Sequence, residues 1–207
     1  WFTSPAVLVG SSNQAPSVAD VGFSTAVPPT TNDDILATWV ESDPDDDELV
    51  DHEIVWYRNG ENVAEAEGLN PLPADLTAKG ELWVAQVRVS DGEAWSPWTN
   101  SDEITVANAP PTVAKVELTS PTFSALHDLA VNFTASDDDG DDASLVEVRW
   151  FLDDVRQTDV GNEDRLPAAH LSRGDTWQAV VVVSDGTDTT EATSDAVLIG
   201  NAPPTVS

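Results

Sequence analysis

The chain has 207 residues, of which 38 are acidic and only 8 are Lys or Arg, so its formal net charge is -30. This charge argues against nucleic acid and anionic membranes as partners, because both need a basic surface, and it favours cations. The 40% hydrophobic content is enough for a packed core, and the absence of Cys removes disulfides and thiolate metal ligands.

An internal repeat organises the chain. The segment Asn108-Ala109-Pro110-Pro111-Thr112-Val113 recurs 93 positions later from Asn201, and a looser copy begins at Asn13. The repeat predicts two complete units, residues 13–107 and 108–200. We expect residues 1–12 to be the terminal strand of a preceding repeat and residues 201–207 to start a following one, as in an excerpt of a longer protein.

The predicted elements of each unit are short strands. In chain order the first unit is expected to have strands at 35–40, 53–58, 82–89 and 103–106, and the second at 129–134, 147–151, 177–183 and 196–199. The strand at 82–89 alternates, and its counterpart repeats the pattern; the residues expected on the inner faces are Trp83, Ala85, Val87, Val89, Trp177, Ala179, Val181 and Val183. Only residues 62–69 suggest a helical turn.

Units of about 94 residues with roughly seven short strands are typical of a β-sandwich, and a Trp in the third strand favours the immunoglobulin-like type. That Trp is Trp56 in the first unit and Trp150 in the second. The sequence therefore predicts an all-β protein, with two tandem immunoglobulin-like β-sandwiches in an extended rod.

An acidic run follows the second predicted strand of each unit. In the first unit, residues 41–48 hold six carboxylates, and residues 136–141 form the corresponding run in the second. Three segments are expected at the same end of this sandwich. They are the loop after the second strand, the Ser-Asp-Gly loop after the sixth strand, and the start of the first strand. The candidate metal ligands that this arrangement gathers are Asn13, Asp43, Asp45, Asp47 and Asp91, and Asn108, Asp137, Asp139, Asp141 and Asp185.

Carboxylate and amide oxygens crowded at a domain border suit a hard cation, and calcium accepts about six to eight such ligands in flexible geometry. The alternate residues of the first run are the expected ligands, whereas Asp46 and Glu48 are expected to face water. The spacing of the aspartates is that of the start of an EF-hand, but no flanking helices or terminal Glu follow in the right context. A solvated, metal-free loop is the alternative interpretation.

These motifs together resemble the tandem immunoglobulin-like, cadherin-like or PKD-like repeats of large prokaryotic cell-surface or extracellular proteins. The shared features are Ser-Asp-Pro-Asp-x-Asp, Trp-Tyr-x-Asn-Gly, Ser-Asp-Gly and Asn-x-Pro-Pro. The resemblance implies calcium ions at the domain borders that stiffen a rod. Two departures affect the ligand set: Asp138 replaces the Pro in the second unit, and the cadherin pattern Asp-x-Asn-Asn-Ala-Pro is absent.

The segment Trp95-Ser96-Pro97-Trp98 occurs only in the first unit, since the second has Asp188-Thr189-Thr190-Glu191 there. Trp95 and Trp98 are candidates for a sugar-binding platform or for contact with a neighbouring chain. The alternative is that both rings pack on the edge of the sandwich.

No nucleophile elbow, phosphate loop or zinc pattern is present, so we expect no enzymatic activity. The first functional hypothesis is a structural repeat of an extracellular stalk, adhesin or filament, stiffened by calcium. The second is an adhesion module that binds carbohydrate or a cell-surface protein. The third is a halophilic surface-layer or filament subunit whose acidity serves solvation alone. The expected location is the cell surface, and the expected partners are neighbouring repeats or other copies, with residues 1–12 as a candidate exchanged strand.

Overall fold

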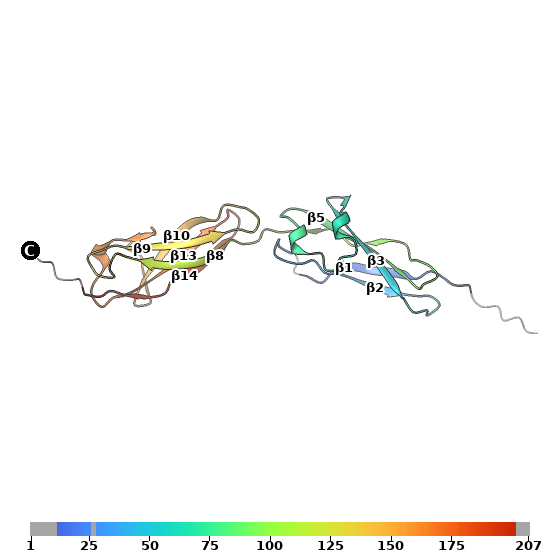
Figure 1. Ribbon diagram of the computed structural model, residues 1–207, viewed down its shortest axis with the longest axis horizontal. Coiled ribbons are helices and arrows are strands. Elements are labelled where there is room, and N and C mark those ends of the chain that lie inside the picture. Colours follow the sequence, from blue (N-terminus) through green and yellow to red (C-terminus); the bar gives the residue numbers. More distant parts are fainter. Residues whose placement is uncertain (1–11, 26–27, 202–207) are drawn as a thin grey trace, which may run out of the picture. The chain divides into compact units, whose positions relative to one another are not determined.

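The computed structural model of the chain consists of two tandem immunoglobulin-like β-sandwiches (Figure 1). It describes residues 12–25 and 28–201. The chain divides into two compact units, residues 1–107 and 108–207. Strands account for 47% of the described residues and helices for 5%, which confirms the all-β prediction. Within the described ranges, no helix combines the length and apolar character needed to span a bilayer.

The first unit pairs a small sheet with a larger one. Its strands are β1 (Ser17–Phe23), β2 (Ala37–Ser42), β3 (Asp51–Arg58), β4 (Glu61–Asn62), β5 (Leu82–Ser90), β6 (Thr99–Asn100) and β7 (Ile104–Thr105). β1 and β2 form the small antiparallel sheet, and the larger sheet has the order β4-β3-β5-β6, with β7 also paired to β5. Two 3-10 turns, η1 (Ala64–Ala66) and η2 (Ala74–Leu76), lie between β4 and β5.

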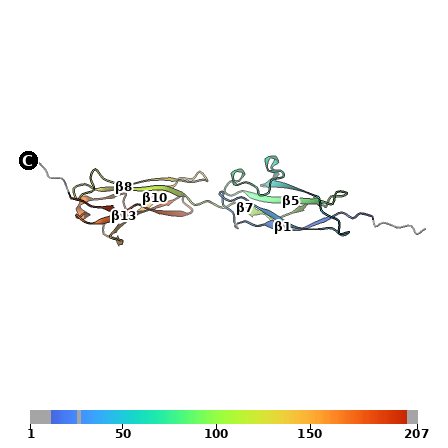
Figure 2. The same cartoon turned by 60° about the horizontal axis from the view of Figure 1, so that its bottom comes forward.

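The second unit repeats this plan. Its strands are β8 (Thr112–Thr119), β9 (Leu129–Ser136), β10 (Ser144–Leu152), β11 (Val155–Gln157), β12 (Arg165–Leu166), β13 (Thr176–Ser184), β14 (Thr189–Thr193) and β15 (Val197–Leu198), and η3 spans Ala168–His170. One sheet has the order β12-β9-β8, and the other has the order β11-β10-β13-β14, with β15 paired to β13. Figure 2 shows β8 and β13 on the two faces of this sandwich.

The core of each unit lies between its two sheets and is built around a pair of Trp rings. Trp56 and Trp83 meet edge to face at 6.3 Å, and Trp150 and Trp177 do so at 6.5 Å. The alternating residues of β5 and β13 fill the remaining space, and all eight predicted inner-face side chains are at most 1% exposed. Each large apolar side chain buried in this way contributes roughly 1.5–3 kcal/mol, which replaces the disulfide that the chain cannot form.

The last strand of each unit is split into two short pieces, and a serine hydroxyl bridges the break. Ser101 lies between β6 and β7, and its Oγ accepts a hydrogen bond from the Ala85 amide at 3.0 Å. Ser194, between β14 and β15, accepts one from the Ala179 amide at the same distance. The hydroxyl takes the place of a backbone carbonyl, so the buried amide keeps a partner where the strand is interrupted.

The predicted elements differ from the observed ones at their ends. The strand expected at 35–40 begins two residues later, because Ile35 pairs instead with Leu72 in an isolated antiparallel bridge. The short strand β6 was not predicted, whereas the expected helical stretch at 62–69 contains the single turn η1. The predicted outer segments, 1–12 and 201–207, lie outside the described residues except for Ser12 and Asn201.

Candidate functional site

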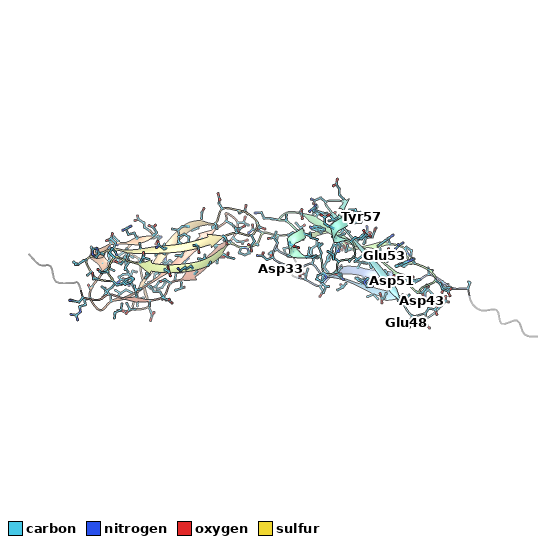
Figure 3. All side chains as sticks on the ribbon, in the orientation of Figure 1. Asp33, Asp43, Glu48, Asp51, Glu53 and Tyr57 are labelled. Carbon is cyan, nitrogen blue, oxygen red and sulfur yellow. The ribbon has the colours of Figure 1, made fainter. Side chains whose placement is uncertain are left out.

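The loop between β2 and β3 places three carboxylates together at one end of the first unit. Figure 3 shows Asp43 and Glu48 at this end and Asp33 at the opposite end of the same unit. Asp43, Asp45 and Asp47 each offer one carboxylate oxygen, and these oxygens lie within 4.8 Å of one another. Asp46 and Glu48 are exposed, as predicted.

Asp43 organises this loop through its own backbone contacts. Its Oδ1 accepts hydrogen bonds from the amides of Asp45 at 2.8 Å and Asp47 at 3.2 Å. An aspartate that bonds the backbone two residues ahead stabilises a turn, and Asp46 completes it with a positive φ of 62°. The other oxygen, Oδ2 of Asp43, is buried and has no hydrogen-bond partner in the described part of the chain.

The segment that leads into β1 closes over the loop. The Gln14 amide donates to Oδ2 of Asp45 at 2.7 Å, and the Gln14 side chain donates to Oδ1 of the same residue at 3.0 Å. A pocket of about 220 Å³ lies here, lined by Asn13, Asp45, Asp47 and Glu93. Glu93 follows β5 and was not among the predicted ligands.

Asp91, in the loop after β5, is connected to this end of the unit through Asn13. The Asn13 amide nitrogen donates to Oδ2 of Asp91 at 3.1 Å, while Oδ1 accepts from the amides of Glu93 and Ala94, both at 2.7 Å. The backbone amide of Ala94, followed by the Asn13 side chain, lowers the pKa of Asp91 below its usual value. Donors that favour the charged form keep this carboxylate ionised.

The second unit repeats the acidic loop between β9 and β10. Asp137 Oδ1 accepts from the amides of Asp139 at 2.9 Å and Asp141 at 3.3 Å, and one carboxylate oxygen from each of the three residues falls within a 4.8 Å group. The Ala109 amide donates to Oδ2 of Asp139 at 2.7 Å. Asp137 Oδ2, like its counterpart in the first unit, is buried without a hydrogen-bond partner among the described residues.

Asn108 holds two carboxylates in the second unit. Its amide nitrogen donates to Oδ2 of Asp185 and to Oδ2 of Asp188, both at 2.8 Å. The Asn108 side chain is the main cause of the lowered pKa of Asp185, and the backbone amide of Asp188 adds to it. Asp188 was not predicted. Ser90 pairs with Trp95 and Ser184 with Thr189, so Asp188 corresponds to Ala94 of the first unit and not to Trp95, the position that the sequence comparison indicated.

The geometry divides the predicted ligands of each unit into two groups. Three aspartates of the acidic loop converge, and one of them presents a buried oxygen that has no donor among the residues described. The Asn and the later aspartate form a hydrogen-bonded pair in which the amide nitrogen faces the carboxylate. The converging oxygens form a donor set that suits calcium, which takes oxygen ligands in flexible arrangements.

Trp95 and Trp98 of the first unit flank a cation. The Arg88 guanidinium carbon lies 4.6 Å from the centre of the Trp95 ring and 4.5 Å from that of Trp98. Arg88 also donates through Nε to Oε2 of Glu53 at 2.6 Å. The two rings therefore pack on the edge of the sheet around Arg88, and Trp98 remains 36% exposed.

Comparison with known proteins gives no family assignment. No protein-family model matches the sequence, and no curated protein is significantly similar to it. Solved structures with similar folds include the FN1–FN3 domains of chicken CNTN1, at 13% identity and a TM-score of 0.34, with 91% of this chain and 65% of that chain covered. A two-domain fibronectin type-III segment of chicken tenascin has 13% identity, a TM-score of 0.36 and coverages of 87% and 98%. Immunoglobulin domains 1–5 of Sidekick-1 have 11% identity, a TM-score of 0.35 and coverages of 92% and 40%.

Proposed function

We propose that the chain is a non-catalytic structural module of an extracellular stalk, adhesin or filament, in which calcium binds the acidic loop between the second and third strands of each unit. Asp43, Asp45 and Asp47 would hold the ion in the first unit, and Asp137, Asp139 and Asp141 would hold it in the second. The bound ion would supply the positive charge that the clustered carboxylates need.

The observation that carries this proposal is the buried Oδ2 atom of Asp43 and of Asp137, each without a hydrogen-bond donor among the described residues. A buried carboxylate oxygen without a donor or cation is costly. The same oxygen is orphaned at the same place in both units, although the surrounding sequences differ. A cation between the three aspartates would satisfy it.

The acidic cluster of the second unit (Asp137, Asp139 and Asp141) is bonded to the segment that connects the two units. The unit boundary falls between Ala107 and Asn108, and Ala109, whose amide contacts the cluster, lies two residues after Ala107. An ion that fixes Asp139 would also fix the Ala109 amide bonded to it. We therefore propose that calcium restricts the motion of this connecting segment.

The test is thermal unfolding of the full chain at about 2 M NaCl, where exposed charges are already screened, first with EGTA and then with millimolar calcium. Ligand linkage predicts a clear rise in Tm, since calcium at about one hundred times its Kd stabilises by about 2.7 kcal/mol. Asp43→Asn and Asp137→Asn should each remove the rise for their own unit. Asp46→Asn and Asp138→Asn are the matched controls, because both residues lie in the same loops and are exposed.

Absence of a calcium-dependent shift, or equal losses in the matched controls, would contradict calcium binding. That result would favour the halophilic alternative, in which the acidity serves solvation alone. The specific observation behind this alternative is the large number of carboxylates that belong to neither cluster, in a chain with 38 acidic residues. A rise in stability with any monovalent salt, but none with calcium, would support it.

A further inference from the structure

The outer face of the larger sheet in the first unit carries a group of uncharged side chains. β3 and β5 turn Trp56 and Ala85 into the core, so their neighbours Tyr57, Val84 and Gln86 lie on the opposite face, where each is half-buried. Tyr57 is paired with Val84 across the two strands, and Gln86 is paired with Asn100 of β6. This face therefore combines an aromatic ring, an apolar floor and two amides.

A pocket of about 320 Å³ opens on this face. Its lining residues are Tyr57, Gly60, Val84, Gln86 and Asn100. The Gln86 side-chain nitrogen donates to Oδ1 of Asn100 at 2.8 Å, and the Tyr57 hydroxyl lies 3.4 Å from Oε1 of Gln86. These contacts hold the amides in place and still leave each amide with unused donor or acceptor capacity.

None of the five lining residues is charged, although the chain carries a net charge of -30. We infer that this pocket binds a neutral saccharide. The ring of Tyr57 offers a flat apolar surface for the carbon–hydrogen face of a sugar, and the two amides offer both donors and acceptors to its hydroxyls. Apolar surface with a few oriented polar groups is the usual composition of a small-molecule site. The negative field of the chain disfavours sialylated or sulfated sugars.

Trp98 provides a second aromatic surface on the same face. Gln86 of β5 is paired with Asn100 of β6. Arg88 lies two residues after Gln86 in β5, and Trp98 lies two residues before Asn100, just outside β6; the Arg88 guanidinium carbon is 4.5 Å from the centre of the Trp98 ring. The positive charge of Arg88, which stacks on Trp98, is offset there by the carboxylate of Glu53. An oligosaccharide could therefore extend from Tyr57, across the Gln86–Asn100 pair, to Trp98.

The pocket is separate from the acidic loop of the same unit. Figure 3 shows Glu53 between Tyr57 and Asp43 along the first unit, so the ring lies away from the acidic end. Saccharide binding is accordingly expected in EGTA as well as in calcium. The proposals of calcium binding and of saccharide binding can therefore be tested, and contradicted, independently of each other.

The second unit provides an internal control, because its corresponding sheet face lacks the amide pair. Phe151 stands at the position of Tyr57, Val180 at that of Gln86, and Thr193 is paired with Val180 as Asn100 is with Gln86. Phe151→Ala removes a ring of similar burial from a face that has no opposed amides. It therefore reports any effect of losing a sheet-face ring on the fold.

The test is binding of the full chain to an array of neutral, sialylated and sulfated oligosaccharides, followed by calorimetric titration with the best neutral oligosaccharide. We expect neutral saccharides to bind in EGTA. Tyr57→Ala and the double variant Gln86→Ala/Asn100→Ala should each weaken binding by about tenfold or more, as expected for central interface residues. Phe151→Ala should bind like the unmodified chain.

The inference is overturned if no neutral saccharide binds, if only charged glycans bind, or if Tyr57→Ala and Phe151→Ala lose binding equally. Loss on Trp98→Ala without loss on Tyr57→Ala would also overturn it, by placing the site on the Trp pair. Near-ultraviolet circular dichroism of each variant checks the fold. Should Tyr57→Ala unfold, Gln86→Ala/Asn100→Ala decides the result, because it leaves the buried side chains unchanged.

Discussion

The two units hold their acidic loops with the same backbone contact and with different side-chain contacts. In both, an amide of the leading segment donates at 2.7 Å to the middle aspartate, from Gln14 to Asp45 and from Ala109 to Asp139. Gln14 adds a side-chain bond that Ala109 cannot make. The backbone contact does not depend on residue type, so it survives where the sequence of the repeat has diverged.

The cores of the two units also differ in the hydrogen bonding of one Trp indole, because the residue two positions before that Trp is Glu in one unit and Asp in the other. The Trp83 indole nitrogen donates to Oε2 of Glu81 at 3.1 Å. In the second unit Asp175 stands at the position of Glu81, and the Trp177 indole nitrogen is buried with no hydrogen-bond partner in the described part of the chain. The shorter aspartate keeps its bond to the Ser172 amide at 2.7 Å but does not reach the ring.

The largest destabilisation is expected from loss of the central Trp residue of either unit. Trp56→Ala and Trp150→Ala should each cost about 3–5 kcal/mol. Trp56 also stacks on Phe23 at 6.2 Å, and Leu118 stands at that point of the second unit. Trp56→Ala should therefore cost about 0.5–1.5 kcal/mol more than its counterpart. Denaturant unfolding of the full chain, fitted with one transition for each unit, measures both values, and a larger cost for Trp150→Ala would contradict this reasoning.

A smaller change in unfolding free energy is expected from exchanging Glu81 and Asp175, the acidic residues two positions before Trp83 and Trp177. Asp175→Glu should supply the acceptor that Trp177 lacks and stabilise the second unit by about 1 kcal/mol. Glu81→Asp should leave the Trp83 indole without its acceptor and destabilise the first unit by about 1–3 kcal/mol. Differential scanning calorimetry of both variants makes the comparison. A gain in the first unit or a loss in the second would show that the indole bond does not control this difference.

The smallest effect concerns acid stability. Aspartates with a lowered folded pKa stabilise the fold above the unfolded pKa of about 3.9, and this stabilisation is lost as the pH falls through the folded pKa. Asn108 is the main cause of the shift at Asp185, whereas at Asp91 the Ala94 amide precedes Asn13. Asn108→Ala should thus raise the pKa of Asp185 more than Asn13→Ala raises that of Asp91. Carboxyl NMR titration measures both, and the destabilisation by each variant should fade as the solution becomes acidic.

Much of the fold follows from local sequence patterns. The alternation of β5 and β13 identifies their buried faces, because strand side chains point to opposite sides at every residue. The bridge between Ile35 and Leu72 could not be foreseen, since it joins two positions far apart in sequence through their backbones. Short pieces such as β6 carry too few residues to show any period.

The candidate sites were predictable where the repeat duplicated them and not where a single unit differed. The aspartates of the acidic loops recur at matching positions, so their convergence could be anticipated. Asp188 and Glu93 have no counterparts in the other unit, and the contribution of Gln14 comes partly from its backbone. The packing of Trp95 and Trp98 depends on Arg88, which belongs to another strand. Such partners become visible only once the sheet register is known.

The broken last strands affect how copies of the protein meet one another. β6 and β14 lie at the edge of the larger sheet in their units, and a long, regular edge is a template for the strand of another molecule. The interruptions at Ser101 and Ser194 keep each regular stretch at the edge short, while the hydroxyls satisfy the amides inside. The buried amides opposite the breaks therefore keep their hydrogen bonds, while the edge strands are too short to pair well with a strand of another molecule. This arrangement disfavours aggregation between copies of a repetitive chain.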